Sequence, residues 1–248
     1  MQKPKTSLIQ PLAYQIRSKR PYYRQAEDRL LWEIGRRVKP DETYVSFSAG
    51  KDSAVLAHAA HSVFPGIQMC LVDPGVPYHW LDDERTMWLD YAREHGWNLR
   101  VFPWDKWGGV LADDQEQRVS QTALHEDMFA EVTAWAREHG YTTALIGLRQ
   151  QESRQRTMAL RKYGMDHTYE DGRRRVCPLS HWGTDDVWTY IVSHGLPWLS
   201  IYDHLGPTAR NGLIGRNAIK QGRMVYLKHF YPEAFRVARD VLSLEYAR

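Results

Sequence analysis

Short apolar runs alternate along the chain with longer segments in which apolar side chains recur at helical spacing. The runs predict buried strands, and they lie at residues 44–48, 67–72, 98–104 and 142–148. The periodic segments predict helices at residues 24–38, 53–60, 82–94, 120–138 and 184–195. Strands separated by helices of this length are typical of parallel βαβ units with right-handed crossovers.

One further feature completes the predicted fold. Asp171-Gly172, inside "TYEDGRRRVCP", predicts a hairpin after the last parallel strand. The fold class is therefore α/β, with a Rossmann-like parallel twisted sheet, helices on both of its faces and a C-terminal helical extension. We expect an N-terminal helical segment over residues 1–42, an α/β domain over residues 43–205 and a basic helical extension over residues 206–248.

The first predicted strand leads into a loop, "SAGKDS", that has the composition of a phosphate site. Backbone N–H groups at the start of the following helix attract anions, Gly50 permits close approach, and Lys51 adds a cation. This is not a Walker A loop, because Asp52 follows the lysine and Val45 stands where the first glycine would be. The alternative is a plain turn in which Asp52 or Ser53 caps the helix and Lys51 is solvated.

A second charged loop, "GLRQQESRQR", follows the fourth apolar run. It supplies, at the exit of a buried strand, Gly147, Arg149, Glu152, Arg154 and Arg156. Because ligands of open parallel sheets bind outside the carboxyl ends of the strands, this loop should face residues 48–53 and the turn at Asp73. The alternative is a solvated helix start with a surface ion pair between Glu152 and Arg156.

The composition of the chain excludes several classes of protein. The 248 residues are enough for one large α/β domain, and a formal net charge of +3 does not require a nucleic-acid partner. The two cysteines, Cys70 and Cys177, are far apart, which excludes a C-x-x-C redox pair, a zinc ribbon and an all-cysteine iron–sulfur cluster. The sequence has no apolar stretch of signal-peptide length, so we expect a cytoplasmic protein with no membrane contact.

The order of the motifs resembles a known family. "SAGKDS" resembles the Ser-Gly-Gly-Lys-Asp-Ser loop, or PP-loop, of N-type ATP pyrophosphatases, with Ala49 where that loop usually has a glycine. Together with "VDPG", "GLRQQESR" and "CPLSHWGTDDVWTYI", it resembles the phosphoadenosine phosphosulfate (PAPS) reductase family, whose relatives include the ATP sulfurylase small subunit and DNA-phosphorothioation proteins. The resemblance spans about residues 44–202 and implies an adenine nucleotide α-hydrolase-like fold.

The resemblance also implies which residues form the site. Adenine would lie against the end of the second strand, and the phosphates would lie in the lysine loop. The implied catalytic residues are Lys51, Asp52 and Arg149, the implied ligands are ATP and magnesium, and no protein metal ligand is predicted. The implied nucleotide-binding residues are Ser48, Ala49, Gly50, Lys51, Asp52, Ser53, Leu71, Asp73, Gly147, Arg149, Glu152 and Arg154.

Departures from the family pattern favour ATP as the substrate. A PAPS reductase resolves a sulfite adduct through a cysteine in a C-terminal Glu-Cys-Gly-(Ile/Leu)-His segment, and no cysteine follows Cys177 here. The Lys-Asp-Ser part of the loop, which reductases tend to lose, is retained. We expect cleavage of ATP between the α and β phosphates, with release of pyrophosphate and adenylylation of an anionic or nucleophilic acceptor, in sulfur metabolism or nucleic-acid modification. Two alternatives stay open: a non-catalytic nucleotide-binding accessory protein of a phage, plasmid or CRISPR-type system, and PAPS reduction with a partner thiol.

The stretch "RNGLIGRNAIKQGRMVYLKHFY", residues 210–231, carries basic and aromatic side chains and no acidic one. These are Arg210, Arg216, Lys220, Arg223 and Lys228, with Tyr226, Phe230 and Tyr231. This mixture predicts contact with nucleic acid or a ribonucleoprotein, or closure over the nucleotide. The alternative is an amphipathic helix that packs Met224, Leu227 and Phe230 on the domain and leaves its basic side solvated.

Overall fold

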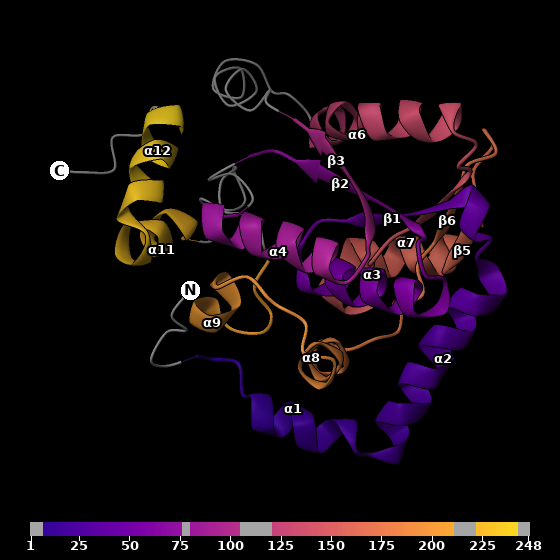
Figure 1. Ribbon diagram of the computed structural model, residues 1–248, viewed down its shortest axis with the longest axis horizontal. Helices are drawn as coiled ribbons and strands as arrows, with labels where there is room; N and C mark the ends of the chain where they lie inside the picture. Colours follow the sequence, from indigo (N-terminus) through magenta and orange to yellow (C-terminus); the bar gives the residue numbers. More distant parts are fainter. Residues whose placement is uncertain (1–6, 76–79, 105–120, 211–221, 243–248) are drawn as a thin grey trace.

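The computed structural model describes residues 7–75, 80–104, 121–210 and 222–242 (Figure 1). Its centre is a six-stranded sheet in the order β3-β2-β1-β4-β6-β5, in which all neighbours are parallel except β5 and β6. The strands are β1 (Thr43–Phe47), β2 (Gln68–Asp73), β3 (Asn98–Pro103), β4 (Thr143–Leu145), β5 (Asp166–Thr168) and β6 (Arg174–Val176). The predicted Rossmann-like sheet is confirmed.

Every predicted helix is present. The helices are α1 (Pro11–Ser18), α2 (Pro21–Arg37), α3 (Lys51–Val63), α4 (Asp82–Glu94), α6 (Gln121–Glu138), α7 (Arg154–Tyr163), α8 (Thr184–Ser193), α9 (Ile201–Leu205), α11 (Arg223–Phe230) and α12 (Pro232–Leu242), with 3-10 turns η1 (Pro40–Glu42) and η2 (Gln150–Glu152). The predicted hairpin is confirmed by the antiparallel β5 and β6, with Gly172 at a φ of 82° between them. Within the described residues, α11 and α12 form the predicted C-terminal helical extension, and they lie beside α9 and the start of α4 in Figure 1.

Alternate residues of the central strands reach two separate cores. Met69 and Leu71 of β2 belong to the larger core, which includes residues of α2, α3, α4 and α8, whereas Cys70 and Val72 belong to a smaller core with α6. Successive side chains of a strand point to opposite faces, so a strand that is buried on both faces reads as a continuous apolar run. Helices therefore cover both faces, and Figure 1 shows α3 and α6 on opposite sides of the sheet.

The strand order places a topological switch point between β1 and β4. From β1 the chain proceeds outward through β2 and β3 on one side, and it returns to add β4 and β6 on the other. Open α/β sheets bind ligands at the carboxyl ends of the two strands where this reversal occurs. β4 ends at Leu145, earlier than the apolar run predicted, and the chain turns toward α3 at Gly147.

The N-terminal helices pack against the rest of the fold. α1 lies against α8, where Arg17 Nη2 and Asp186 Oδ1 are 2.6 Å apart, and α2 lies against α3. The division of the chain at residues 42 and 205 stays a prediction. Among the helices of the described ranges, none combines the length and the hydropathy that crossing a membrane requires.

Candidate functional site

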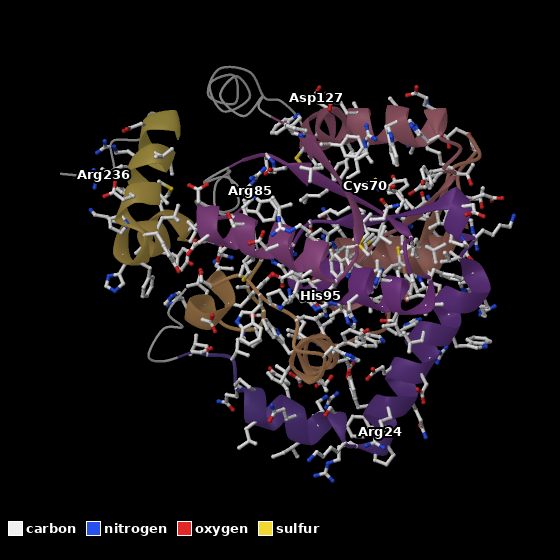
Figure 2. The ribbon with its side chains drawn as sticks, in the orientation of Figure 1. Arg24, Cys70, Arg85, His95, Asp127 and Arg236 are labelled. Atoms are coloured by element: carbon white, nitrogen blue, oxygen red, sulfur yellow. The ribbon has the colours of Figure 1, made fainter. Side chains whose placement is uncertain are left out.

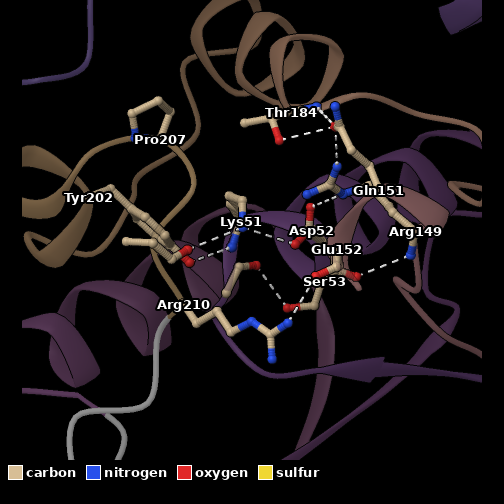
Figure 3. Close-up of polar contacts among 12 residues, drawn as sticks. Lys51, Asp52, Ser53, Arg149, Gln151, Glu152, Thr184, Tyr202, Pro207 and Arg210 are labelled. Carbon is tan, nitrogen blue, oxygen red and sulfur yellow. Dashed lines mark hydrogen bonds and ion pairs between the residues drawn. The ribbon is translucent and has the colours of Figure 1, made fainter. Parts of the chain in front are cut away.

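Lys51 is the first residue of α3, and its ammonium group is buried at the start of that helix (Figure 3). The residue is 5% exposed, and its Nζ donates to the carbonyl of Ala209 at 3.3 Å and lies 3.2 Å from Asp52 Oδ2. The same Nζ lies 5.5 Å from the centre of the Tyr202 ring, and the Lys51 backbone N–H donates to the Tyr202 hydroxyl at 3.2 Å. The alternative of a solvated lysine is therefore wrong.

Asp52 holds two cations at once. Its Oδ1 accepts a 2.6 Å hydrogen bond from Arg149 Nε, while its Oδ2 faces Lys51. Arg149 is 2% exposed, and its Nη1 also donates to the Trp182 carbonyl at 3.2 Å and to Gln151 Oε1 at 3.4 Å. A buried charge is tolerated when it is paired and hydrogen-bonded in this way. The structure thus brings together the three predicted catalytic residues, from loops 97 positions apart.

Two serines fasten the loop between β1 and α3. Ser53 Oγ donates to the Gly50 carbonyl at 2.9 Å and accepts the Ser48 N–H at 3.1 Å. Ala49 has a φ of 53° and is the one non-glycine residue with positive φ in the described ranges. The left-handed region costs such a residue about 1–2 kcal/mol. The loop therefore keeps, with an alanine, a backbone turn that a glycine would adopt without strain.

Gly147 lets the exit of β4 approach the first turn of α3. A Cβ atom at this position would lie 3.0 Å from the Asp52 carbonyl carbon and 3.1 Å from the Ser53 nitrogen. Contacts this short force backbone to move, so any side chain would push the two loops apart. The structure therefore gives Gly147 a packing role that fixes the distance between the two charged loops.

The remaining predicted residues differ in their surroundings. Asp73 is 6% exposed and closes the turn after β2, because its carboxylate accepts from the Gly75 N–H at 2.9 Å, Trp80 Nε1 at 3.1 Å and Arg85 Nε at 2.6 Å. Leu71 is fully buried in the core. Their contacts with adenine stay a prediction.

Glu152 and Arg154 lie close to the start of α7 but have different surroundings. The Glu152 carboxylate accepts the Arg149 N–H at 3.1 Å and pairs with Arg156, so the predicted i,i+4 pair is present. Arg154 is exposed, and within the described residues no hydrogen bond or ion pair joins it to α3. The alternative of a solvated helix start therefore describes Arg154 but is wrong for the buried Arg149.

Sequence analysis missed the segment that lies across Lys51. Tyr202 of α9 is followed by residues 206–210, whose Pro207 carbonyl accepts from Trp188 Nε1 at 2.9 Å and whose Arg210 Nη2 donates to the Glu152 carbonyl at 3.1 Å. Figure 3 shows Tyr202 and Pro207 on one side of Lys51 and Arg149 on the other. Tyr202 and Lys51 are 151 positions apart, so no local pattern could have joined them.

The basic C-terminal stretch is partly internal. Arg223 is 5% exposed, donates to the Arg210 carbonyl at 3.2 Å, and burial lowers the pKa of its guanidinium group. Met224, Tyr226 and Leu227 are buried, whereas Phe230 is 43% exposed and stacks on His204. Packing of Met224 and Leu227 is thus confirmed, and the expectation that Arg223 and Tyr226 are open to nucleic acid is wrong. Arg216 and Lys220 lie outside the described residues.

Neither cysteine is placed for thiol chemistry. Both are free and buried, and burial raises the pKa of Cys70 to about 12 and that of Cys177 to about 11. Because the thiolate is the nucleophile, these thiols are inert at neutral pH. In the part of the chain that the structure describes, histidine, cysteine and carboxylate side chains do not gather in threes as metal ligands.

Lys51 and Arg149 share Asp52 at the N-terminus of α3, at the switch point of a parallel sheet. This arrangement is typical of the PP-loop, adenine nucleotide α-hydrolase-like class of α/β folds. The particular family follows from sequence comparison. The model of the phosphoadenosine phosphosulfate reductase domain matches residues 42–208, and the chain belongs to this family.

The similar curated proteins are named as reductases of adenosine 5'-phosphosulfate or of phosphoadenosine 5'-phosphosulfate, and the similar solved structures include a further kind of enzyme. The chain is 24% identical over 178 residues to an adenosine 5'-phosphosulfate reductase of Bacillus cytotoxicus, covering 66% of this chain and 68% of that one. It is 27% identical to a phosphoadenosine 5'-phosphosulfate reductase of Xylella fastidiosa, covering 72% and 73%. Among solved structures, the PAPS reductase of Candida auris has a TM-score of 0.52 at 14% identity, covering 72% and 84%. A U34-tRNA thiolase of Methanococcus maripaludis has a TM-score of 0.56 at 12% identity, covering 89% and 78%.

Proposed function

We propose that this chain binds ATP by its phosphates at the start of α3 and, with magnesium, cleaves it between the α and β phosphates. The observation that carries this proposal is the buried pair of cations, Lys51 and Arg149, on the two oxygens of Asp52. In the reaction, an acceptor nucleophile forms a bond to the α phosphorus, the bond from that phosphorus to the bridging oxygen breaks, and pyrophosphate leaves with the electron pair. The products are pyrophosphate and an adenylylated acceptor.

The groups around Lys51 suit the phosphates. The first turn of a helix has backbone N–H groups without intrahelical partners, and Ser48 and Ser53 add hydroxyls beside them. Lys51 would exchange the oxygens of Asp52 and Ala209 for phosphate oxygens and stabilise the charge that grows on the leaving pyrophosphate. This exchange requires two movements, which are rotation of the flexible Lys51 side chain and displacement of residues 206–210.

Magnesium is proposed to arrive on the phosphates of ATP. Asp52, the carboxylate nearest to Lys51, already pairs with both Lys51 and Arg149, and Asp73 pairs with Arg85. Once phosphate oxygens take over Lys51, Asp52 regains one oxygen that suits a hard cation. Magnesium would add positive charge on the phosphoryl oxygens, and the residues of this chain would position the anhydride.

A second candidate is reduction of adenosine phosphosulfate or PAPS, which is what the names of the relatives state. The buried Cys70 and Cys177 do not support an internal thiol, so this reaction would use a thiol of a partner protein. A third candidate, binding without turnover, draws on the strained Ala49 in the loop.

Calorimetric titration with ATP, AMP, adenosine phosphosulfate and PAPS distinguishes these candidates when it is combined with a pyrophosphate assay on α-labelled ATP. Lys51→Met should weaken ATP binding at least about tenfold and AMP binding much less, because a charge-assisted contact to the β or γ phosphate is worth roughly 1.5–3 kcal/mol. Lys39→Met is the matched control, since the Lys39 side chain is 73% exposed and pairs only with Glu42 at the surface of the described chain.

Each result selects one candidate. Release of pyrophosphate with formation of an AMP adduct supports the first. Tighter binding of PAPS than of ATP favours the reductase. Tight ATP binding without pyrophosphate release supports the third candidate, binding without turnover. Equal ATP affinity of wild type and Lys51→Met contradicts the phosphate site itself.

A further inference from the structure

The solvent-facing side of α2 carries aromatic and polar side chains at helical spacing. Tyr22, Gln25, Arg29, Trp32 and Arg36, named the α2 stripe below, are all exposed and recur every three or four residues. Side chains at this spacing lie along one face, and the stripe extends over about 21 Å of helix. Tyr22 is 53% exposed and Trp32 is 60% exposed, although the core makes no use of either ring.

Both exposed rings are held by arginine. Arg36 lies over the Trp32 ring, with its Cζ 4.4 Å from the ring centre. Arg17 lies over the Tyr22 ring at 4.9 Å and donates to its hydroxyl at 2.7 Å. Rings fixed on one face by a guanidinium group keep the other face available for a second flat partner.

The charge around the stripe is positive. Arg20, Arg24 and Arg29 are exposed and have no ion pair within the described part of the chain. Two of the neighbouring carboxylates are already paired, since Glu33 pairs with Arg36 and Arg37, and Asp186 pairs with Arg17. Asp28 is the exposed acidic residue of α2. Figure 2 shows Arg24 at the outer side of α2, at the edge of the molecule.

A cavity of about 280 Å³ opens beside the stripe. Tyr22, Gln25 and Arg29 form one wall, and Pro178, His181 and Trp182 form part of the other. Sites for drug-sized ligands usually enclose about 300–1,000 Å³, so this cavity suits a smaller flat group. The Gln25 amide offers donors and an acceptor to the edge of a nucleobase.

We propose that the α2 stripe binds single-stranded nucleic acid. Arg20, Arg24 and Arg29 contact phosphates, Trp32 stacks on a base, and one further base enters the cavity beside Tyr22. Protein interfaces centre on a desolvated apolar core, whereas here arginines separate the two rings and leave the face positive. A flexible polyanion with flat bases complements both features. This surface is independent of the nucleotide chemistry proposed for Lys51.

The test is fluorescence anisotropy with a fluorescein-labelled oligouridine of about 12 nucleotides, within the usual size of single-strand sites. Oligothymidine of the same length and an RNA duplex are compared to separate RNA from DNA and single from double strands. We expect the single strands to bind and the duplex to bind more weakly. Trp32→Ala should lower the affinity about fivefold or more. Arg29→Ala should lower it and reduce the salt slope by about 0.7, the value for one lost phosphate contact.

Arg236→Ala is the matched arginine control, because Arg236 lies in α12 on the opposite side of the molecule from Arg24 in Figure 2. Lys228→Ala probes the basic C-terminal stretch. Unchanged binding in both controls together with losses in Trp32→Ala and Arg29→Ala supports the proposal. Loss in Lys228→Ala but not in the α2 variants overturns it, as does equal binding of duplex and single strands. The proposal is also overturned if none of the oligonucleotides binds. This holds whether the protein elutes as a monomer or as a dimer formed through α2.

Discussion

Cationic side chains occur in two opposite settings in this protein. At the start of α3, Lys51 and Arg149 are 5% and 2% exposed and share a single carboxylate, Asp52. Arg20 at the N-cap of α2, and Arg24 and Arg29 on the outer side of that helix, are exposed and have no carboxylate partner in the described ranges. Burial makes a charge depend on its partners, so the first group is tied to the fold, whereas the second group can change with little effect on it. The contrast separates side chains that build a site from side chains that only offer a surface.

The largest effect is expected at the buried pair. Arg149→Ala removes a buried guanidinium group and leaves Asp52 paired with Lys51 alone, so the free energy of unfolding should fall by about 3–5 kcal/mol, as for other broken buried pairs. Urea titration of the ligand-free protein measures this. Arg154→Ala, at the exposed start of α7, is the control and should change the free energy by less than about 0.5 kcal/mol. Equal effects in the two variants would remove the distinction between buried and exposed cations.

The next effect concerns the approach of the two charged loops. Gly147→Ala places a methyl group about 3 Å from the backbone of Asp52 and Ser53 and should cost about 1–3 kcal/mol of stability. Gly35→Ala, inside α2, meets only Val63 Cγ1 at 3.7 Å and should stabilise the protein by about 0.5–1 kcal/mol through helix propensity. Thermal unfolding measures both variants, and we expect the melting temperature to fall in Gly147→Ala and to rise in Gly35→Ala. A loss in Gly35→Ala as large as that in Gly147→Ala would show that the α3 loop is not specially packed.

A smaller effect depends on pH and lies on the inner side of α2. His194 Nε2 is 2.6 Å from Glu27 Oε1, and His58 Nδ1 is 2.9 Å from the Tyr190 hydroxyl, with the two imidazole rings 5.1 Å apart. Burial lowers the pKa of His58 to about 4, and the hydrogen bond from His194 lowers that of Glu27. Because the unfolded chain protonates His58 near pH 6.5 and the folded chain does not, stability should fall as the pH drops from about 6.5 to about 4.

His58→Gln tests this expectation, since glutamine keeps a hydrogen-bonding group but does not titrate. After allowance for solvent screening, we expect the His58 contribution to the pH dependence to be about 1 kcal/mol. Urea titrations at several pH values measure the slope. A variant whose stability falls over this range as steeply as that of the wild type would assign the dependence to other groups.

The smallest effect is expected on the α2 stripe. Trp32→Ala removes an exposed ring that stacks on Arg36, so the free energy of unfolding should fall by at most about 1 kcal/mol. Trp188→Ala removes a fully buried ring and should cost about 3–5 kcal/mol. Circular dichroism during heating compares the two. A large loss in Trp32→Ala would mean that the outer side of α2 supports the fold and is not merely a surface.

Much of the fold could be predicted because its causes are local. The apolar run in β2 is continuous since both faces of that strand are covered, and the helix at Asp82–Glu94 was predicted with its observed ends. Gly172 gave the hairpin through a positive φ. The length of β4 was predicted less well, because the turn at Gly147 depends on the approach of α3, which belongs to another part of the chain.

The sequence by itself determined the α/β class, the order of elements and the presence of a lysine loop opposite an arginine loop. Only the tertiary structure decided that Lys51 is buried, that Asp52 joins it to Arg149, and that Tyr202 and Ala209 lie across it. The physical reason is the range of the interactions. Periodicity and turn chemistry act between residues a few positions apart, whereas the burial and pairing of Lys51 depend on a segment 158 positions away.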